Sequence, residues 1–217
     1  MKIKVCGMRN AENISELVKL KPDFIGFIFY NKSKRFVEDF PPIKFPSTIK
    51  KVGVFVNEEI NKIIEIVQNY NLNIVQLHGN ETPEDCIKIK KCHLERSRKI
   101  VSESLEIIKA FSVDENFNFE STTAYENICD YFLFDTKGSN YGGNGIKFNW
   151  EILQKYKGRT PFLLSGGITK KDSTEILSFL QRQKSKLCIG VDINSGFEIE
   201  LGLKNIKDIE EFKNNLV

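Results

Sequence analysis

The sequence predicts an α/β fold in which residues 1–217 form a single (β/α)8 barrel, the TIM-barrel architecture. Eight short apolar runs rich in β-branched residues recur along the 217-residue chain, and amphipathic segments with helical spacing lie between most of them. Most of the runs are continuously apolar, which is typical of parallel strands that are covered on both faces. Eight strand–helix units in a chain of this length favour a small closed barrel.

The predicted strands are the β-branched runs 3–6, 24–29, 51–56, 74–77, 107–111, 131–135, 161–164 and 188–191. Asn10 is predicted to cap a first helix, residues 58–70 place four apolar side chains on one helical stripe, and Thr169 is expected to open a later helix. The competing architecture is an open doubly wound sheet. It would need a nucleotide-type glycine fingerprint after the first strand, and residues 6–9 do not supply one.

Two segments depart from the regular repeat. Pro41, Pro42 and Pro46 fall where the second helix belongs, so that helix is expected to be degenerate, short or absent. Residues 92–106 are polar and longer than an ordinary helix-to-strand connection. We expect them to form an insertion before the fifth strand that extends the preceding helix on the far side of the barrel.

Composition excludes several classes of function. Hydrophobic residues make up 41% of the chain and charged residues 28%, with a formal net charge of +3, so no nucleic-acid or membrane partner is implied. Five scattered cysteines argue against a disulfide framework and a zinc site, and they suggest a reducing compartment. The chain enters its first strand without a signal peptide, so we expect a cytoplasmic protein.

Side chains with useful chemistry gather at the C-terminal ends of the predicted strands, where barrels of this type carry their active sites. Cys6 follows the first strand, Arg35 the second, His78 the fourth and Asp135 the sixth. Each has a purely structural alternative: a small core thiol, a solvated loop residue, a turn residue and a turn-capping carboxylate, respectively. Their convergence at one end of a barrel favours a shared catalytic site.

Glycine-rich loops follow three of the predicted strands. Asp135 leads into a loop containing Gly142 and Gly143, where the backbone can pass close to a ligand. The loops after strands seven and eight hold a further set of candidates, which we expect to bind phosphate through backbone N–H groups and a helix N-terminus: Gly166, Gly167, Asn194, Ser195 and Gly196. The alternative is a pair of structural turns.

Nine short motifs, taken in order, resemble those of the phosphoribosylanthranilate isomerase family. They are residues 4–8, 26–29, 33–36, 52–57, 75–79, 134–136, 142–145, 165–168 and 191–196. The chain departs from the family pattern in its proline-rich second helix, in the long segment before Glu106, and at Asn194, where the family more often has serine. None of these departures removes a reactive side chain.

The resemblance implies an Amadori rearrangement of N-(5-phosphoribosyl)anthranilate, in the pathway to tryptophan. By the same resemblance, Asp135 is the acid that protonates the ring oxygen, Cys6 is the base that removes the C2′ proton, and Arg35 binds the anthranilate carboxylate. His78, Gly142 and Gly143 are expected to contact the substrate. No metal or cofactor is implied, the partner is a small phosphosugar, and the protein is expected to be a monomer or a homodimer.

Three rival functions are conceivable for a barrel of this kind. A metal-dependent phosphosugar epimerase would need clustered histidine and carboxylate ligands, and only His78 of the two histidines lies at a strand end. The related isomerase of histidine biosynthesis is expected to use a pair of aspartates, which Cys6 argues against. A barrel that binds a phosphosugar without turning it over, or one with different specificity, stays open.

Overall fold

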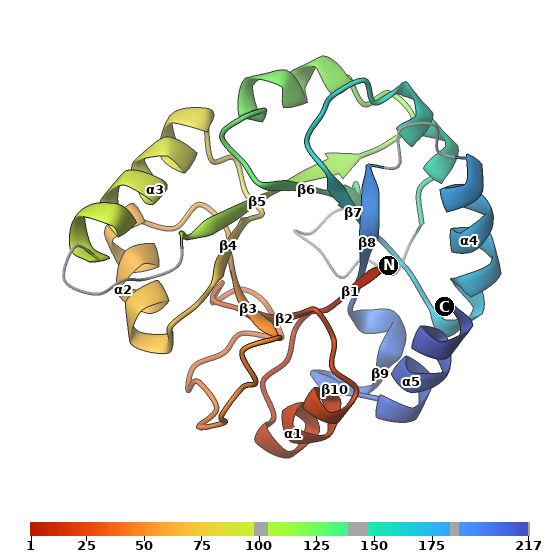
Figure 1. Cartoon of the computed structure of the whole chain (residues 1–217), viewed down its shortest axis with the longest axis horizontal. Helices are drawn as coiled ribbons and strands as arrows, with labels where there is room; N and C mark the ends of the chain where they lie inside the picture. The colour runs from red at the N-terminus through yellow and green to blue at the C-terminus, as the bar shows by residue number, and fades with distance from the viewer. Residues whose placement is uncertain (98–103, 139–146, 183–186, 217) are drawn as a thin grey trace.

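The computed structural model describes residues 1–97, 104–138, 147–182 and 187–216. Eight parallel strands, each paired with the next, form a closed barrel in which β8 pairs with β1 (Figure 1). They are β1 (Lys2–Val5), β2 (Phe24–Ile28), β3 (Lys50–Phe55), β4 (Ile74–Leu77), β5 (Glu106–Val113), β6 (Tyr131–Thr136), β7 (Phe162–Leu164) and β8 (Cys188–Ile193). The predicted fold class is confirmed, and all eight predicted strands are present with end-point shifts of a few residues.

Helices surround the barrel (Figure 1). They are α1 (Ala11–Lys19), α2 (Ile60–Tyr70), α3 (Pro83–Ser97), α4 (Ser173–Arg182) and α5 (Ile206–Asn215). As predicted, Asn10 caps α1, because its side chain accepts a hydrogen bond from the Asn13 N–H. Thr169 begins the short 3₁₀ helix η3 (Lys170–Asp172), which leads into α4, and it forms a capping box with Asp172. No helix among the described residues is long and apolar enough to cross a membrane.

The connections between strands are less regular than eight repeated units would require. Residues 29–49 contain no helix, as the three prolines predicted. Among their described residues, the connections after β5 and β6 contain only the 3₁₀ helices η1 (Phe119–Tyr125) and η2 (Trp150–Lys155), which the sequence did not reveal. Aromatic side chains pack there instead, since the Phe134 ring lies 5.6 Å from the Phe119 ring and 5.4 Å from the Tyr156 ring. Bulky rings thus cover the outside of the sheet where a longer helix is missing.

The predicted insertion before β5 is partly a helix. Cys92 to Ser97 continue α3, as expected, and residues 98–103 lie outside the described part of the chain. His93 is buried at 8% exposure, so the segment is not a purely solvated extension. The helix therefore contributes to the packing of the barrel up to at least this position.

Side chains inside the barrel follow the two-residue period of its strands. An inner apolar cluster fills the barrel, and its buried members are Phe24, Val52, Ile74, Ile108, Ala110, Leu133 and Leu163. A larger cluster occupies the layer between the strands and the helices. Two residues after Leu133 along β6, Asp135 is the next side chain on the same face. The polar site therefore lies directly on top of the apolar core.

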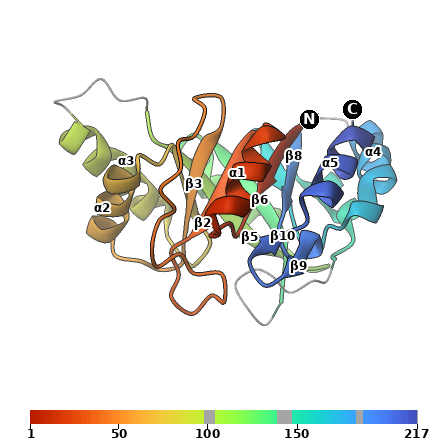
Figure 2. The same cartoon turned by 90° about the horizontal axis from the view of Figure 1, so that it is seen from below.

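A small hairpin follows β8 and was not predicted. It comprises the 3₁₀ helix η4 (Ser195–Phe197), β9 (Glu198–Glu200) and β10 (Leu203–Lys204). Seen from the side, the hairpin lies at the lower edge of the barrel while both termini lie at the upper edge (Figure 2). Asn13 of α1 fixes the hairpin, because its amide donates to the Lys204 carbonyl at 2.9 Å and accepts from the Lys204 N–H at 2.8 Å.

We predict that Asn13→Ala destabilises the protein by about 1–3 kcal/mol, because it leaves both backbone groups of Lys204 buried without a partner. Urea unfolding measures the change. Ser15→Ala on the exposed face of the same helix is the control and should change stability by less than about 0.5 kcal/mol. Equal effects of the two substitutions would mean that the hairpin is held by other contacts.

Candidate functional site

A cavity of about 770 Å³, including space open to solvent, lies at the C-terminal ends of the strands. It is lined by all of the predicted site residues that the structure describes: Cys6, Arg35, His78, Asp135, Gly166, Gly167, Asn194, Ser195 and Gly196. Gly142 and Gly143 lie outside the described residues. Residues that are up to 190 positions apart in sequence therefore meet in one site.

Cys6 follows β1 directly, and its N–H donates to the Ile193 carbonyl of β8 at 2.9 Å. Gly26 of β2 leaves room for the thiol, since a Cβ at that position would lie 2.8 Å from Cys6 Sγ. Burial raises the pKa of the Cys6 thiol, and the nearby Lys4 ammonium opposes that effect by its charge and a hydrogen bond. The thiol is therefore more reluctant to ionise than a free cysteine, and its ionisation depends on neighbouring cations.

Asp135 and His78 face each other across the cavity floor. Oδ2 of Asp135 lies 3.4 Å from Nε2 of His78, and its Oδ1 accepts the Thr136 N–H at 3.0 Å. The Gln76 amide nitrogen lies 2.9 Å from His78 Nδ1. With the Gln76 amide nitrogen as donor, Nδ1 is the acceptor, and the matching neutral tautomer carries its proton on Nε2, toward Asp135. The arrangement can pass a proton to or from the carboxylate.

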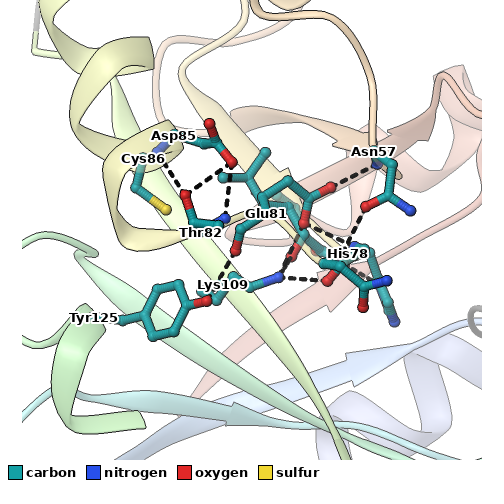
Figure 3. Close-up of polar contacts among 12 residues, drawn as sticks. Asn57, His78, Glu81, Thr82, Asp85, Cys86, Lys109 and Tyr125 are labelled. Atoms are coloured by element: carbon teal, nitrogen blue, oxygen red, sulfur yellow. Dashed lines mark hydrogen bonds and ion pairs between the residues drawn. The ribbon is translucent and has the colours of Figure 1, made fainter. Parts of the chain in front are cut away.

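The loop that carries His78 is held by a buried ion pair. Glu81 lies between Asn57 and Lys109 (Figure 3), and its carboxylate accepts the N–H groups of Asn57 at 2.7 Å and Gly79 at 2.9 Å. Lys109 of β5 lies 2.9 Å from Glu81 Oε2 and donates to the Gly79 carbonyl at 2.7 Å. One carboxylate and one ammonium therefore tie the loops after β3 and β4 to β5.

Arg35 lines the cavity, but a protein carboxylate holds its guanidinium. Nε and one Nη donate to the two carboxylate oxygens of Glu198, each at 2.7 Å. Lys204 donates to the same carboxylate at 2.7 Å and to Asn194 Oδ1 at 2.7 Å. Burial alone would raise the pKa of Glu198, but the hydrogen bonds from Arg35 and Lys204 outweigh it and hold that pKa at about 2. The other guanidinium N–H groups stay available for a ligand.

The loops after β7 and β8 show why glycine occupies their turns. Gly166 has a φ of +93° and a Cβ there would lie 2.1 Å from Thr136 Oγ1, while Gly167 has a φ of +62°. A Cβ on Gly196 would lie 2.1 Å from the Ile168 carbonyl, so this glycine lets the two loops touch. Within the described residues, neither Gly166 nor Gly167 donates its N–H to a protein acceptor. These groups can receive an anion.

Several residues that line or support the cavity were not among the predicted site residues. They are Lys4, Gln76, Thr136 and Lys204. Lys4 and Gln76 each precede a predicted residue by two positions on an otherwise apolar strand, and a polar residue in such a run was a usable signal. Within the described part of the chain, the Gln76 Oε1 and Thr136 Oγ1 atoms are buried without a hydrogen-bond partner. No cluster of three or more potential metal ligands occurs among those residues.

Comparison with known proteins links this geometry to one family. Residues 3–215 match the family model described as N-(5′-phosphoribosyl)anthranilate isomerase. The protein of that name from Parabacteroides distasonis is 46% identical over 98% of this chain and 91% of its own length. Its counterpart from Phocaeicola vulgatus is 43% identical over 100% of this chain and 98% of its own length.

Comparison with solved structures points to the same family. The phosphoribosylanthranilate isomerase from Thermotoga maritima superposes with a TM-score of 0.79 at 31% identity, covering 100% of this chain and 98% of its own. Another phosphoribosylanthranilate isomerase structure, at 31% identity and a TM-score of 0.77 over the same shares, is in complex with reduced 1-(o-carboxyphenylamino)-1-deoxyribulose 5-phosphate.

We predict that Lys109→Met destabilises the protein by about 3–5 kcal/mol, because it leaves the Glu81 carboxylate buried and unpaired. Lys90→Met is the matched control, since Lys90 makes a 2.8 Å ion pair with Asp130 in which both side chains are about one-third exposed. That change should cost at most about 1 kcal/mol. Denaturant unfolding compares the two variants, and similar losses would contradict the role given to burial.

Proposed function

The chain belongs to the N-(5′-phosphoribosyl)anthranilate isomerase family, and we propose that its own residues carry out the reaction with Cys6 as the base and Asp135 as the acid. The isomerisation of phosphoribosylanthranilate, a step of tryptophan biosynthesis, is the activity of this enzyme. The observation that carries the assignment of roles is the shared cavity. A thiol from the end of β1 and a carboxylate from β6 both line it.

The reaction needs an acid first. We assign Asp135 to protonate the ring oxygen of the ribose, which breaks the bond between that oxygen and C1′ and leaves an open-chain iminium. The nearby Nε2–H of His78 supports this role, because it can hydrogen-bond the carboxylate that remains after proton transfer. Asp135 is only 6% exposed, so bulk water competes little for its proton.

The base acts second. We assign Cys6, as thiolate, to remove the proton from C2′, so that the C–H electron pair forms the C1′=C2′ double bond and neutralises the iminium. Tautomerisation of the resulting enolamine gives the ketone of the product. Burial of the thiol suits this step, since a desolvated thiolate is a stronger base toward carbon than a hydrated one.

Substrate orientation follows from two groups of donors. We assign the phosphate to the backbone of Gly166, Gly167, Ser195 and Gly196, and the anthranilate carboxylate to the N–H groups of Arg35 that Glu198 does not occupy. The helix that begins near Thr169 contributes less than the sequence suggested, because the carboxylate of Asp172 already accepts the Thr169 N–H at 2.7 Å. Asn194 supports the loop through Lys204.

The neutral polar groups complete the site. We assign the unpartnered atoms Gln76 Oε1 and Thr136 Oγ1 to hydroxyl groups of the ribose, and His78, with the loop holding Gly142 and Gly143, to further substrate contacts.

A monomer or a homodimer is proposed; a Thermotoga maritima relative is described as dimeric. We place the enzyme in the cytoplasm, since none of the five cysteines forms a disulfide, even though the Cys86 and Cys129 sulfurs lie only 3.8 Å apart.

We predict that Cys6→Ser and Asp135→Asn each fold normally and lose more than about tenfold in kcat with little change in KM. A serine hydroxyl is too weak a base at neutral pH, and an amide cannot donate as a carboxylic acid does. Steady-state kinetics on purified protein test both. Cys92→Ser on α3 and the exposed Asp114→Asn are the controls and should keep wild-type kcat. A Cys6→Ser enzyme that retained more than about a tenth of the turnover would remove the thiol from its role.

We also predict that inorganic phosphate inhibits competitively and that Gly166→Ala weakens this inhibition and raises KM by about tenfold or more. The added methyl group clashes with Thr136 and the positive φ strains it, so the loop must shift. Lys34→Met is the discriminating control, with an expected change below about twofold. If Lys34→Met weakened the inhibition and Gly166→Ala did not, the phosphate would sit at the loop after β2 and Arg35 could not bind the carboxylate.

A further inference from the structure

Lys4 is the least expected side chain in the barrel. It is fully buried at 0% exposure, it lies two residues before Cys6, and alternation along the strand points both side chains to the same face. Its ammonium donates to Asp192 Oδ1 of β8 at 2.8 Å. A buried ion pair of this kind is commonly no more stabilising than apolar side chains of similar size. Stability alone therefore does not account for a lysine at this position.

Cations outnumber carboxylates among the ionisable groups nearest to Cys6. The ionisable groups that face it are Lys4 on β1, Asp192 on β8, Lys204 on β10 and Arg35 after β2. Lys4 is paired with Asp192, while Lys204 and Arg35 share the single carboxylate of Glu198. Three cations therefore meet two carboxylates on this side of the cavity, and the third carboxylate, Asp135, lies toward His78. A Cys6 thiolate would place a negative charge beside these cations.

We propose that Lys4 is a positioning residue for the reaction, whose ammonium, fixed by Asp192, stabilises the thiolate form of Cys6 that accepts the proton from C2′. The proposal rests on the assignment of Cys6 as the base. In the step itself the thiolate gains the proton and becomes S–H, while the C–H electron pair enters the substrate. Lys4 stays an ammonium throughout, and no bond to it forms or breaks.

The ionisation behaviour of the groups agrees with this role. Burial raises the pKa of Cys6, and Lys4 is the largest influence that lowers it, with a smaller contribution from Lys204; Asp192 acts in the opposite direction. Burial alone would lower the pKa of Lys4, but Asp192 and Cys6 outweigh it, so that pKa is raised and Lys4 stays charged while the thiol titrates. Cys188 shows the contrast, since burial is the largest influence on it and raises its pKa to about 12.

The test follows thiolate formation by ultraviolet absorbance and, in parallel, kcat/KM as a function of pH. Subtracting the Cys6→Ser curve from the wild-type curve isolates the titration of Cys6. In Lys4→Met, we expect the Cys6 titration and the pH at which kcat/KM rises to move up together by on the order of one pH unit or more. Lys4→Arg keeps the charge and should shift both by much less.

Lys2→Met is the matched control, because it makes the same chemical change two residues earlier on the same face, where the side chain is 43% exposed. It should leave the titration unchanged. A folded Lys4→Met protein with an unshifted Cys6 titration would overturn the proposal, even if its kcat fell. The thiol titration does not depend on catalysis. Cys6→Ser kinetics therefore test whether Cys6 is the base, and the titration of Lys4→Met tests separately whether Lys4 stabilises the thiolate.

The wild-type protein supplies a second test in case Lys4→Met does not fold. Subtracting a Cys188→Ala curve isolates the titration of Cys188, a thiol whose pKa is raised to about 12 chiefly by burial. Cys6 should lose its proton at a lower pH than Cys188, in line with its neighbouring ammonium groups. Equal midpoints for the two thiols would overturn the proposal without any substitution at Lys4.

Discussion

The parallel pairing of β1 with β8 is the contact on which the rest of the structure depends. It closes the barrel and sets Lys4 directly opposite Asp192 in the register of the two strands. The same register lets Cys6 donate to Ile193 beyond the last strand pair, which holds the thiol at the rim of the cavity. A shift of one residue would turn each inward side chain of β1 outward. The register of this closure therefore fixes both the Lys4–Asp192 ion pair and the position of the proposed base.

Alternation along parallel strands explains the layout of the site. On β4 and β6 the apolar residues Ile74 and Leu133 fill the barrel, and the next inward positions carry Gln76 and Asp135. The chemistry lies one layer above the core, so polar groups there are dry and their interactions are strong. The loop residue His78 continues the β4 series and meets Asp135 for the same geometric reason.

Much of the fold and of the cavity lining could be predicted because both depend on local signals. Apolar β-branched runs marked the strands, and strand ends marked Cys6 and Asp135. The partner of Arg35 could not be predicted, because Glu198 is 163 residues away and reaches it only through a hairpin that has no strong sequence pattern. The 3₁₀ helices after β5 and β6 were missed because aromatic packing, a tertiary effect, replaces longer helices there. Lys4 was visible in the sequence as a charged residue inside an apolar strand. Its partner Asp192 could not be predicted, because the pairing depends on the register of β1 with β8.

The site contains two kinds of polar group: those that already have a protein partner, and those that have none until substrate binds. Arg35, His78, Cys6 and Asp135 each have a protein partner that sets their orientation. The atoms without one, within the described residues, are neutral: Gln76 Oε1, Thr136 Oγ1 and the N–H groups of Gly166 and Gly167. Fixing the charged groups in advance avoids reorganisation during the proton transfers, where electrostatic stabilisation matters most. Neutral groups can stay unpaired until substrate binds, because burying an unpaired neutral group costs less free energy than burying an unpaired charge. This division of roles accounts for a buried lysine, a doubly bound glutamate and several unsatisfied atoms in one small cavity.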